Sequence, residues 1–320
     1  ASVTEPPTSV EDGAAAQRAA IPVYARLLGA THTEPVVDVV TGTSAGGLNG
    51  MLLAVAVHLG LPVEKFSLVR STWMNDGDLA SLLRSPNETD PPSLLQGDAY
   101  FQHRIEKVLE TWWAARTPTD CEVDLVTTYT RVTPTPVARV DDFDEALNEV
   151  SYAGTLRFTH SQLDEDPAQV RRKLAIAART SAGIPGVFEP SFLPSGQAAA
   201  EASKRPDFSP HQPPEVRGMS RWAVDGGVVV NLPLRYVIDR IFGQRSDARV
   251  RRVVLYVSPT PADALERIGD DPGRRPSIAM SAITIVNAPR AEGIAGDVDA
   301  IRRSNQAVER QRQARCSIGT

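Results

Sequence analysis

The pentapeptide Gly-Thr-Ser-Ala-Gly at residues 42–46 constrains the fold more than any other feature of this sequence. It follows a valine-rich run at 36–40 and leads directly into an apolar segment at 47–57. A strand, a tight turn with a glycine on each side of a serine, and then an apolar helix form the pattern in which a serine hydroxyl is held exposed at the edge of a sheet. We therefore predict that Ser44 is a nucleophile. A side chain at Gly42 or Gly46 is expected to collide where the strand turns into the helix.

Segments rich in β-branched residues alternate with helical patterns along the rest of the chain. The predicted strands are 36–40, 122–130, 155–159, 220–224 and 250–257, and the predicted helices are 9–28, 47–57, 100–113, 170–178 and 234–242. Such alternation is typical of a mostly parallel sheet with helices on both faces. The sequence thus predicts the α/β class, with one domain spanning 1–320.

Two segments are set apart from this alternation. Residues 195–217 are polar and contain several prolines, so we predict a long surface loop, either a tolerated insertion or a lid. Residues 278–320 are predicted to form a C-terminal helical extension. Its arginines between 302 and 315 are interpreted as a solvated basic face, with attraction to anionic phospholipid headgroups as the alternative.

Composition excludes several kinds of partner. The net charge of −5 argues against a nucleic-acid partner. Cys121 and Cys316 are too far apart to suggest a metal-ligand motif, and two unpaired thiols favour a reducing compartment. The sequence has neither a signal-peptide layout nor an apolar run of about 18 residues. We expect a cytoplasmic protein, with peripheral contact at the inner face of a membrane as an open alternative.

A serine hydroxyl needs a base to accept its proton, and Asp225 is the candidate that stands out. In α/β hydrolases a histidine follows the serine and the acid, but no histidine follows Asp225 here. Asp225 ends an apolar strand and precedes Gly226 and Gly227. The carboxyl ends of strands in open α/β sheets gather around one crevice, so we expect Ser44 and Asp225 to meet there. An ordinary Asp-Gly-Gly turn is the alternative.

Three blocks in this order resemble the patatin-like phospholipase family. They are residues 42–47, residues 175–190, and Asp225-Gly226-Gly227 with Asn231 and Pro233. The similarity extends over roughly residues 36–257. It implies a three-layer α/β/α fold and a catalytic dyad without histidine, in which Ser44 attacks and Asp225 acts as base. It also implies hydrolysis of acyl esters of phospholipids or related lipids, with no metal or other cofactor.

The sequence departs from the family pattern upstream of the serine. The family usually has a glycine-rich loop there, whose backbone N–H groups bind the oxyanion, but only Gly13 and Gly29 occur before residue 36. We expect the first strand and this loop to precede Ala1. Within the chain, the backbone N–H of Ala45 is the predicted oxyanion donor. Loss of one such donor typically costs about 3 kcal/mol of transition-state stabilisation.

Two other functions stay open from the sequence. The first is a Ser-His-Asp esterase with His211 as base, which requires segment 195–217 to fold over the serine. The second is a lipid-binding or regulatory module that keeps the serine turn but does not hydrolyse esters. A lipid or phospholipid is the expected partner under each reading that retains the family resemblance.

Overall fold

The computed structural model describes residues 10–61, 69, 73, 79–117, 119–140, 146–230, 233–243, 250, 252–257, 302, 303, 306 and 310. The chain divides into two compact units, residues 1–37 and 38–320. The first unit contains helix α1 (Val10–Thr31), which runs through Pro22 and ends three residues beyond its predicted end, followed by residues 32–37 without helix or strand. The single domain predicted over 1–320 stays a prediction.

The second unit is built on a five-stranded sheet with the order β1-β2-β5-β4 and with β3 paired to β2. Its strands are β1 (Val39–Gly42), β2 (Asp124–Val140), β3 (Ala146–Phe158), β4 (Ser191–Leu193) and β5 (Arg221–Asp225). Only β1 and β2 pair in parallel among the described strands. The pairs β2/β3, β2/β5 and β4/β5 are antiparallel. The expected mostly parallel sheet is therefore wrong for the described strands, which form a mixed sheet.

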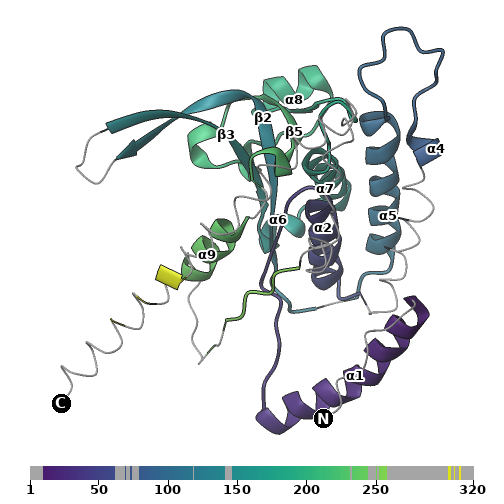
Figure 1. Cartoon of the computed structure of the whole chain (residues 1–320), viewed down its shortest axis with the longest axis vertical. Helices are drawn as coiled ribbons and strands as arrows, with labels where there is room; N and C mark the ends of the chain where they lie inside the picture. The colour runs from purple at the N-terminus through teal and green to yellow at the C-terminus, as the bar shows by residue number, and fades with distance from the viewer. Residues whose placement is uncertain are drawn as a thin grey trace, which may run out of the picture. The chain divides into compact units, whose positions relative to one another are not determined.

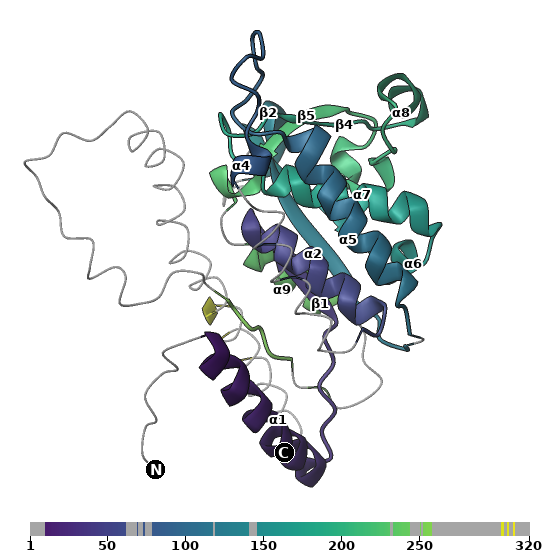
Figure 2. The same ribbon diagram turned by 90° about the vertical axis from the view of Figure 1, so that its right-hand side faces the viewer.

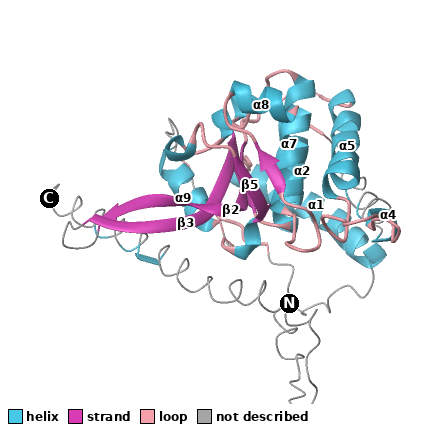
Figure 3. Ribbon diagram, turned by 90° about the horizontal axis from the view of Figure 1, so that it is seen from above, coloured by secondary structure: helices cyan, strands magenta, loops and turns pink. Residues whose placement is uncertain are grey.

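Strands β2 and β3 explain part of this difference. Only residues 141–145 separate them in the sequence, too few for the helical crossover that parallel neighbours need. Both strands are longer than predicted, and their distal ends form an arm that projects from the helices (Figure 3). Pro134 falls in the register shift between Thr130 and Thr135, a position where the ladder tolerates proline.

Helices cover both faces of the sheet. Figures 1 and 2 show α2 (Ala45–His58), α5 (His103–Ala114) and α7 (Pro167–Ser181) together on one face. Helix α9 (Leu234–Gly243) lies on the other face, where Arg240 Nε is 2.5 Å from Asp124 Oδ2 on β2. This arrangement is the predicted three-layer α/β/α architecture.

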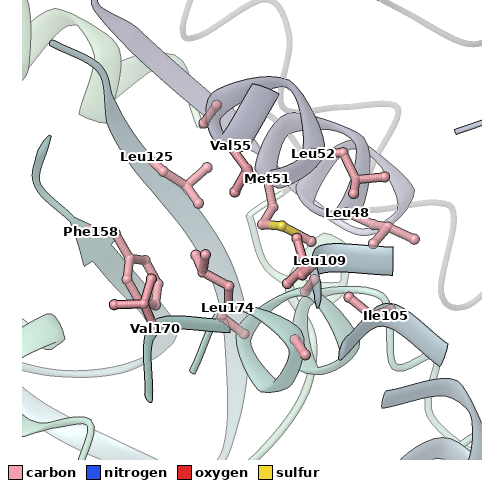
Figure 4. Packing of buried hydrophobic residues seen from close by; sticks show 14 of the residues in the cluster. Leu48, Met51, Leu52, Val55, Ile105, Leu109, Leu125, Phe158, Val170 and Leu174 are labelled. Atoms are coloured by element: carbon pink, nitrogen blue, oxygen red, sulfur yellow. The ribbon is translucent and has the colours of Figure 1, made fainter. Parts of the chain in front are cut away.

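The core lies between the sheet and the face formed by α2, α5 and α7 (Figure 4). Met51 and Val55 of α2 are fully buried, as are Leu109 of α5 and Leu174 of α7, and they pack toward Leu125 of β2. Helix α2 is apolar nearly all round, as a helix packed on several sides requires. The core therefore fixes α2, whose first residue follows Ser44.

The remaining short elements are α4 (Leu79–Leu82), the π-helix η2 (Gly97–Gln102), α6 (His160–Leu163), α8 (Gln197–Ser203) and the 3₁₀ turns η3 (Ser209–His211), η4 (Pro214–Val216) and η5 (Gly226–Val228). Segment 195–217, which we predicted to be a long surface loop, contains three of these elements, α8, η3 and η4. Phe208 and Val216 are buried, so apolar anchors hold this segment against the protein.

Two further predictions concern the C-terminal part of the chain, at 250–257 and at 278–320. The strand predicted at 250–257 is wrong, because its described residues have no strand structure and Leu255 is 84% exposed. Most of the helical extension predicted at 278–320 lies outside the described residues, as does Asn231.

Candidate active site

The turn between β1 and α2 holds Ser44 in an unusual backbone conformation. Its φ is 56° and its ψ is −131°, a combination that a residue with a side chain rarely adopts. A Cβ atom at Gly42 would lie 2.1 Å from the carbonyl oxygen of Gly46, so the strand can enter this turn only with glycine at 42. The turn thus stores backbone strain at the residue predicted to react.

The expected collision at Gly46 is wrong, because a Cβ atom there would meet nothing within 4 Å. The close approach is at Gly47, where a Cβ atom would lie 2.3 Å from the hydroxyl oxygen of Ser181. Ser181 is the last residue of α7. Glycine at 47 therefore lets the start of α2 pack directly against the end of α7.

Ser44 and Asp225 are in direct contact. The Ser44 hydroxyl donates to Asp225 Oδ2 at 2.7 Å, although 181 positions separate the two residues. Asp225 is fully buried, whereas Ser44 is half-buried. The second carboxylate oxygen, Oδ1, accepts a hydrogen bond of 2.7 Å from the N–H of Gly227. This second bond fixes the carboxylate so that Oδ2 faces the serine.

The sheet topology brings these two residues together. Strand β1 ends with Gly42 opposite Thr127 of β2, and β5 ends with Asp225 opposite Tyr129 of the same strand. Because β1 is parallel to β2 and β5 is antiparallel, the two strands run toward each other and their carboxyl ends meet. The expected meeting of strand ends thus occurs, but in a mixed sheet rather than at one edge of a parallel sheet.

Thr128 lies between Thr127 and Tyr129 on β2 and supports the turns that follow β1 and β5. Its hydroxyl is 2.7 Å from the hydroxyl of Thr43. A Cβ atom at Gly226 would lie 2.2 Å from the Thr128 hydroxyl oxygen and 2.5 Å from its carbonyl oxygen. The glycine after Asp225 is therefore required by the close passage of the chain over β2.

The end of α7 provides further support that the sequence reasoning missed. The hydroxyl of Ser181 accepts a hydrogen bond from the Ser44 N–H at 3.2 Å. The carbonyl of Gly183 accepts one from the Asp225 N–H at 2.8 Å. Ser181 and Gly183 both lie in the block 175–190 on which the family resemblance rests. The sequence therefore contains these residues in the expected block, but it does not indicate that they contact Ser44 and Asp225.

Buried ion pairs of Arg179 with Asp98 and Glu189 hold the chain on both sides of the end of α7. Arg179 has no exposed surface, and its Nε lies 2.9 Å from Asp98 Oδ1, while its Nη2 donates to the carbonyl of Glu189 at 2.6 Å. Burial alone would raise the pKa of Glu189, but hydrogen bonds from the Asp98 N–H and the Ser93 hydroxyl, with the charge of Arg179, lower it to about 2. Glu189 is thus an anion near neutral pH and fixes the segment after Ser181.

His211 is placed elsewhere. Its Nδ1 lies 3.0 Å from the carbonyl oxygen of Arg157, and its ring stacks on Phe158 at 4.3 Å. Burial lowers the pKa of His211 to about 4, with a further contribution from the charge of Lys173. The residue that contacts the Ser44 hydroxyl is Asp225, and the described contacts of His211 are with β3 and the segment around Phe208.

Ala45 begins α2 and is exposed beside Ser44. The first N–H groups of a helix have no partner within the helix and carry the positive end of its dipole. The N–H of Ala45 can therefore stabilise negative charge that develops next to the serine.

Among the described residues, one group has the composition of a metal site, namely His58, His160 and Asp164. His58 ends α2, at the opposite end from Ser44.

The comparison with protein families agrees with this geometry. The model of the patatin-like phospholipase family matches residues 17–238. The chain belongs to the patatin-like phospholipase family. This match spans β1, α2, α7 and β5, and so includes the whole contact between Ser44 and Asp225.

A relative among curated proteins is the "Uncharacterized membrane protein Rv3479" of Mycobacterium tuberculosis (strain ATCC 25618 / H37Rv). It is 31% identical over 321 residues, which cover 94% of this chain. The chain spans 28% of the length of that relative. No solved structure matches the chain significantly. None of the helices described for this patatin-like chain combines the length and apolarity needed to cross a bilayer.

Proposed function

We propose that this patatin-like domain hydrolyses carboxylic ester bonds of lipids, with Ser44 as nucleophile and Asp225 as general base. The hydrogen bond of 2.7 Å from the Ser44 hydroxyl to Asp225 Oδ2 carries this proposal. It has the length and direction that transfer of the serine proton to a carboxylate requires. The Gly227 N–H keeps the carboxylate oriented.

The proposed reaction has two halves. Asp225 accepts the Ser44 proton while the serine oxygen attacks the ester carbonyl, and the carboxylic acid then protonates the departing alcohol. A water molecule next loses a proton to Asp225 and attacks the acyl-enzyme, and the carboxylic acid of Asp225 returns that proton to the Ser44 oxygen as the fatty acid is released. In both halves the Ala45 N–H is proposed to donate to the oxyanion.

Exposed apolar side chains on the elements that carry and follow Asp225 favour a lipid partner. Trp222 lies on β5, three residues before Asp225, and is 55% exposed, and Val229 follows η5 and is 48% exposed. An exposed tryptophan is well suited to the boundary between water and lipid headgroups. We propose phospholipid as the substrate class and peripheral contact with a membrane surface. A cytoplasmic location stays a prediction from the sequence.

The test measures fatty-acid release from phospholipid vesicles and labelling by a serine-directed fluorophosphonate. We expect the wild-type protein to do both, Ser44→Ala to do neither, and Ser161→Ala, which changes an exposed serine on α6, to behave like the wild type. A folded wild-type protein that neither reacts with the probe nor releases fatty acid would favour the non-catalytic lipid-binding module instead.

A further inference from the structure

A second group of side chains with potential chemistry lies at the other end of α2. His58 is the last residue of α2, His160 is the first residue of α6, and Asp164 directly follows α6. The Nε2 atom of His58 is 3.6 Å from Asp164 Oδ1, and the Nε2 atom of His160 is 3.4 Å from Asp164 Oδ2. One ligand atom from each residue fits within 4.8 Å of the others.

His58 is the unusual member of this group. Its side chain is only 1% exposed, and although the ring interacts with the Leu163 backbone and the Asp164 carboxylate, neither ring nitrogen makes a hydrogen bond of good geometry to a residue that the structure describes. Buried polar groups nearly always have a partner, so an imidazole in this position indicates a missing ligand.

The nitrogen–oxygen distances in this group are longer than ordinary hydrogen bonds and close to the separation of two ligands of one metal ion. Two ligands held about 2.0–2.2 Å from one ion lie roughly 3.4 Å apart in a tetrahedral site and roughly 3.0 Å apart at right angles in an octahedral one. The observed nitrogen–oxygen separations of 3.4 and 3.6 Å are near the tetrahedral value, but His58 faces Oδ1 of Asp164 and His160 faces Oδ2, so zinc binding requires a small rotation of the carboxylate to present one oxygen to both rings. Two imidazoles and one carboxylate are a donor set that suits zinc.

We propose that His58, His160 and Asp164 bind a zinc ion, with water as the fourth ligand. Helix α2 has 14 residues, so about 20 Å separates this group from Ser44. The ion is therefore outside the ester site, and its role is to join the end of α2 to α6. Zinc would satisfy the buried nitrogen of His58 and hold the core helix that follows the nucleophile.

Arg116 supplies the competing explanation for this cluster. Its Nη2 donates to Asp164 Oδ1 at 2.9 Å, which makes Asp164 part of an ion pair without any metal. If the group serves only this ion pair, removal of Arg116 should matter and metals should not bind. If zinc binds, Arg116 competes for the carboxylate or supports it from outside, and its removal leaves the three ligands in place.

The experiment starts from chelator-treated protein. Titration with Zn²⁺ is monitored by calorimetry and by thermal unfolding, and titration with Co²⁺ is monitored by visible absorption. We expect one equivalent of zinc to bind and, at about a hundredfold excess over Kd, to raise Tm by about 5–10 °C. Cobalt should give the intense visible bands of a tetrahedral site.

The variants separate specific from incidental binding. His160→Ala and Asp164→Asn, which change half-exposed and exposed side chains, should lose the zinc-dependent shift in Tm and the cobalt bands. Arg116→Ala and His103→Ala, an exposed histidine on α5, should keep them. Absence of zinc binding to the wild type, or equal binding by His160→Ala, would overturn the proposal. Because no readout depends on ester hydrolysis, failure of the proposed function would leave this result unaffected.

Discussion

Gly42 and Asp225 end two strands that run toward each other along β2, and their partners on that strand, Thr127 and Tyr129, are only two residues apart. Close backbone packing leaves no room for a side chain at either strand end: a Cβ atom at Gly42 would meet the backbone of Gly46, and one at Gly226 would meet Thr128. The contact between Ser44 and Asp225 therefore depends on backbone packing as much as on the two side chains themselves.

Gly42→Ala should abolish ester hydrolysis and lower the free energy of unfolding by about 3 kcal/mol or more, because its Cβ atom would meet the Gly46 backbone at 2.1 Å. Gly46→Ala is the matched control. Its Cβ atom meets nothing within 4 Å, and alanine favours a helix by up to about 1 kcal/mol over glycine. Urea unfolding measures both variants. Equal destabilisation by the two alanines would contradict this account of the turn.

His211→Asn should keep kcat/KM within about threefold of the wild-type value, since the imidazole contacts Arg157 and Phe158 rather than the serine. The variant should nevertheless lose about 1–3 kcal/mol of stability, because a buried, stacked ring is replaced by a smaller side chain. Hydrolysis rates and urea midpoints are measured on the same preparation. A thousandfold loss of rate in a folded variant would instead identify His211 as the base of a triad.

Glu189 is expected to contribute to acid unfolding. Its pKa is about 2 in the folded protein against 4.5 for a free side chain, so the unfolded chain binds the proton first as the pH falls. The stabilisation is present above about pH 4.5 and is lost as the pH falls toward 2. The shift corresponds to at most about 3 kcal/mol.

Glu189→Gln tests this contribution. The variant should be less stable at pH 7, because Arg179 stays buried while it loses the charge of one partner. Its free energy of unfolding should also depend less on pH between 4.5 and 2 than that of the wild type. Urea unfolding at a series of pH values measures both effects, and parallel pH profiles for the two proteins would show that Glu189 does not carry this dependence.

The sequence was sufficient to predict the parts of the fold that depend on local pattern. The strand, serine turn and apolar helix at 39–58 are present, and so are the later strand and turn at Asp225. These elements are marked by β-branched runs, glycines and an uninterrupted apolar helix. The expected proximity of Ser44 and Asp225 is confirmed by their hydrogen bond, while their catalytic roles stay predictions.

Features that depend on long-range pairing were not predictable in the same way. The direction of β5 relative to β2 has no local signal, so the sheet was expected to be mostly parallel. The collision was expected at Gly46, but it occurs at Gly47 because α7 packs there, and the sequence does not indicate which helix approaches. Segment 195–217 looked like a loop because its prolines are conspicuous, whereas Phe208 anchors it in the core.

In the proposed reaction a carboxylate, without imidazole, activates the serine. The most direct measurement is the rate of phospholipid hydrolysis by Asp225→Asn, with folding checked by circular dichroism and with Asp239→Asn, an exposed aspartate on α9, as control. We expect kcat to fall by about 10²- to 10⁴-fold for Asp225→Asn and to stay unchanged for the control. A folded Asp225→Asn protein that turns over substrate at the wild-type rate would contradict the proposed reaction.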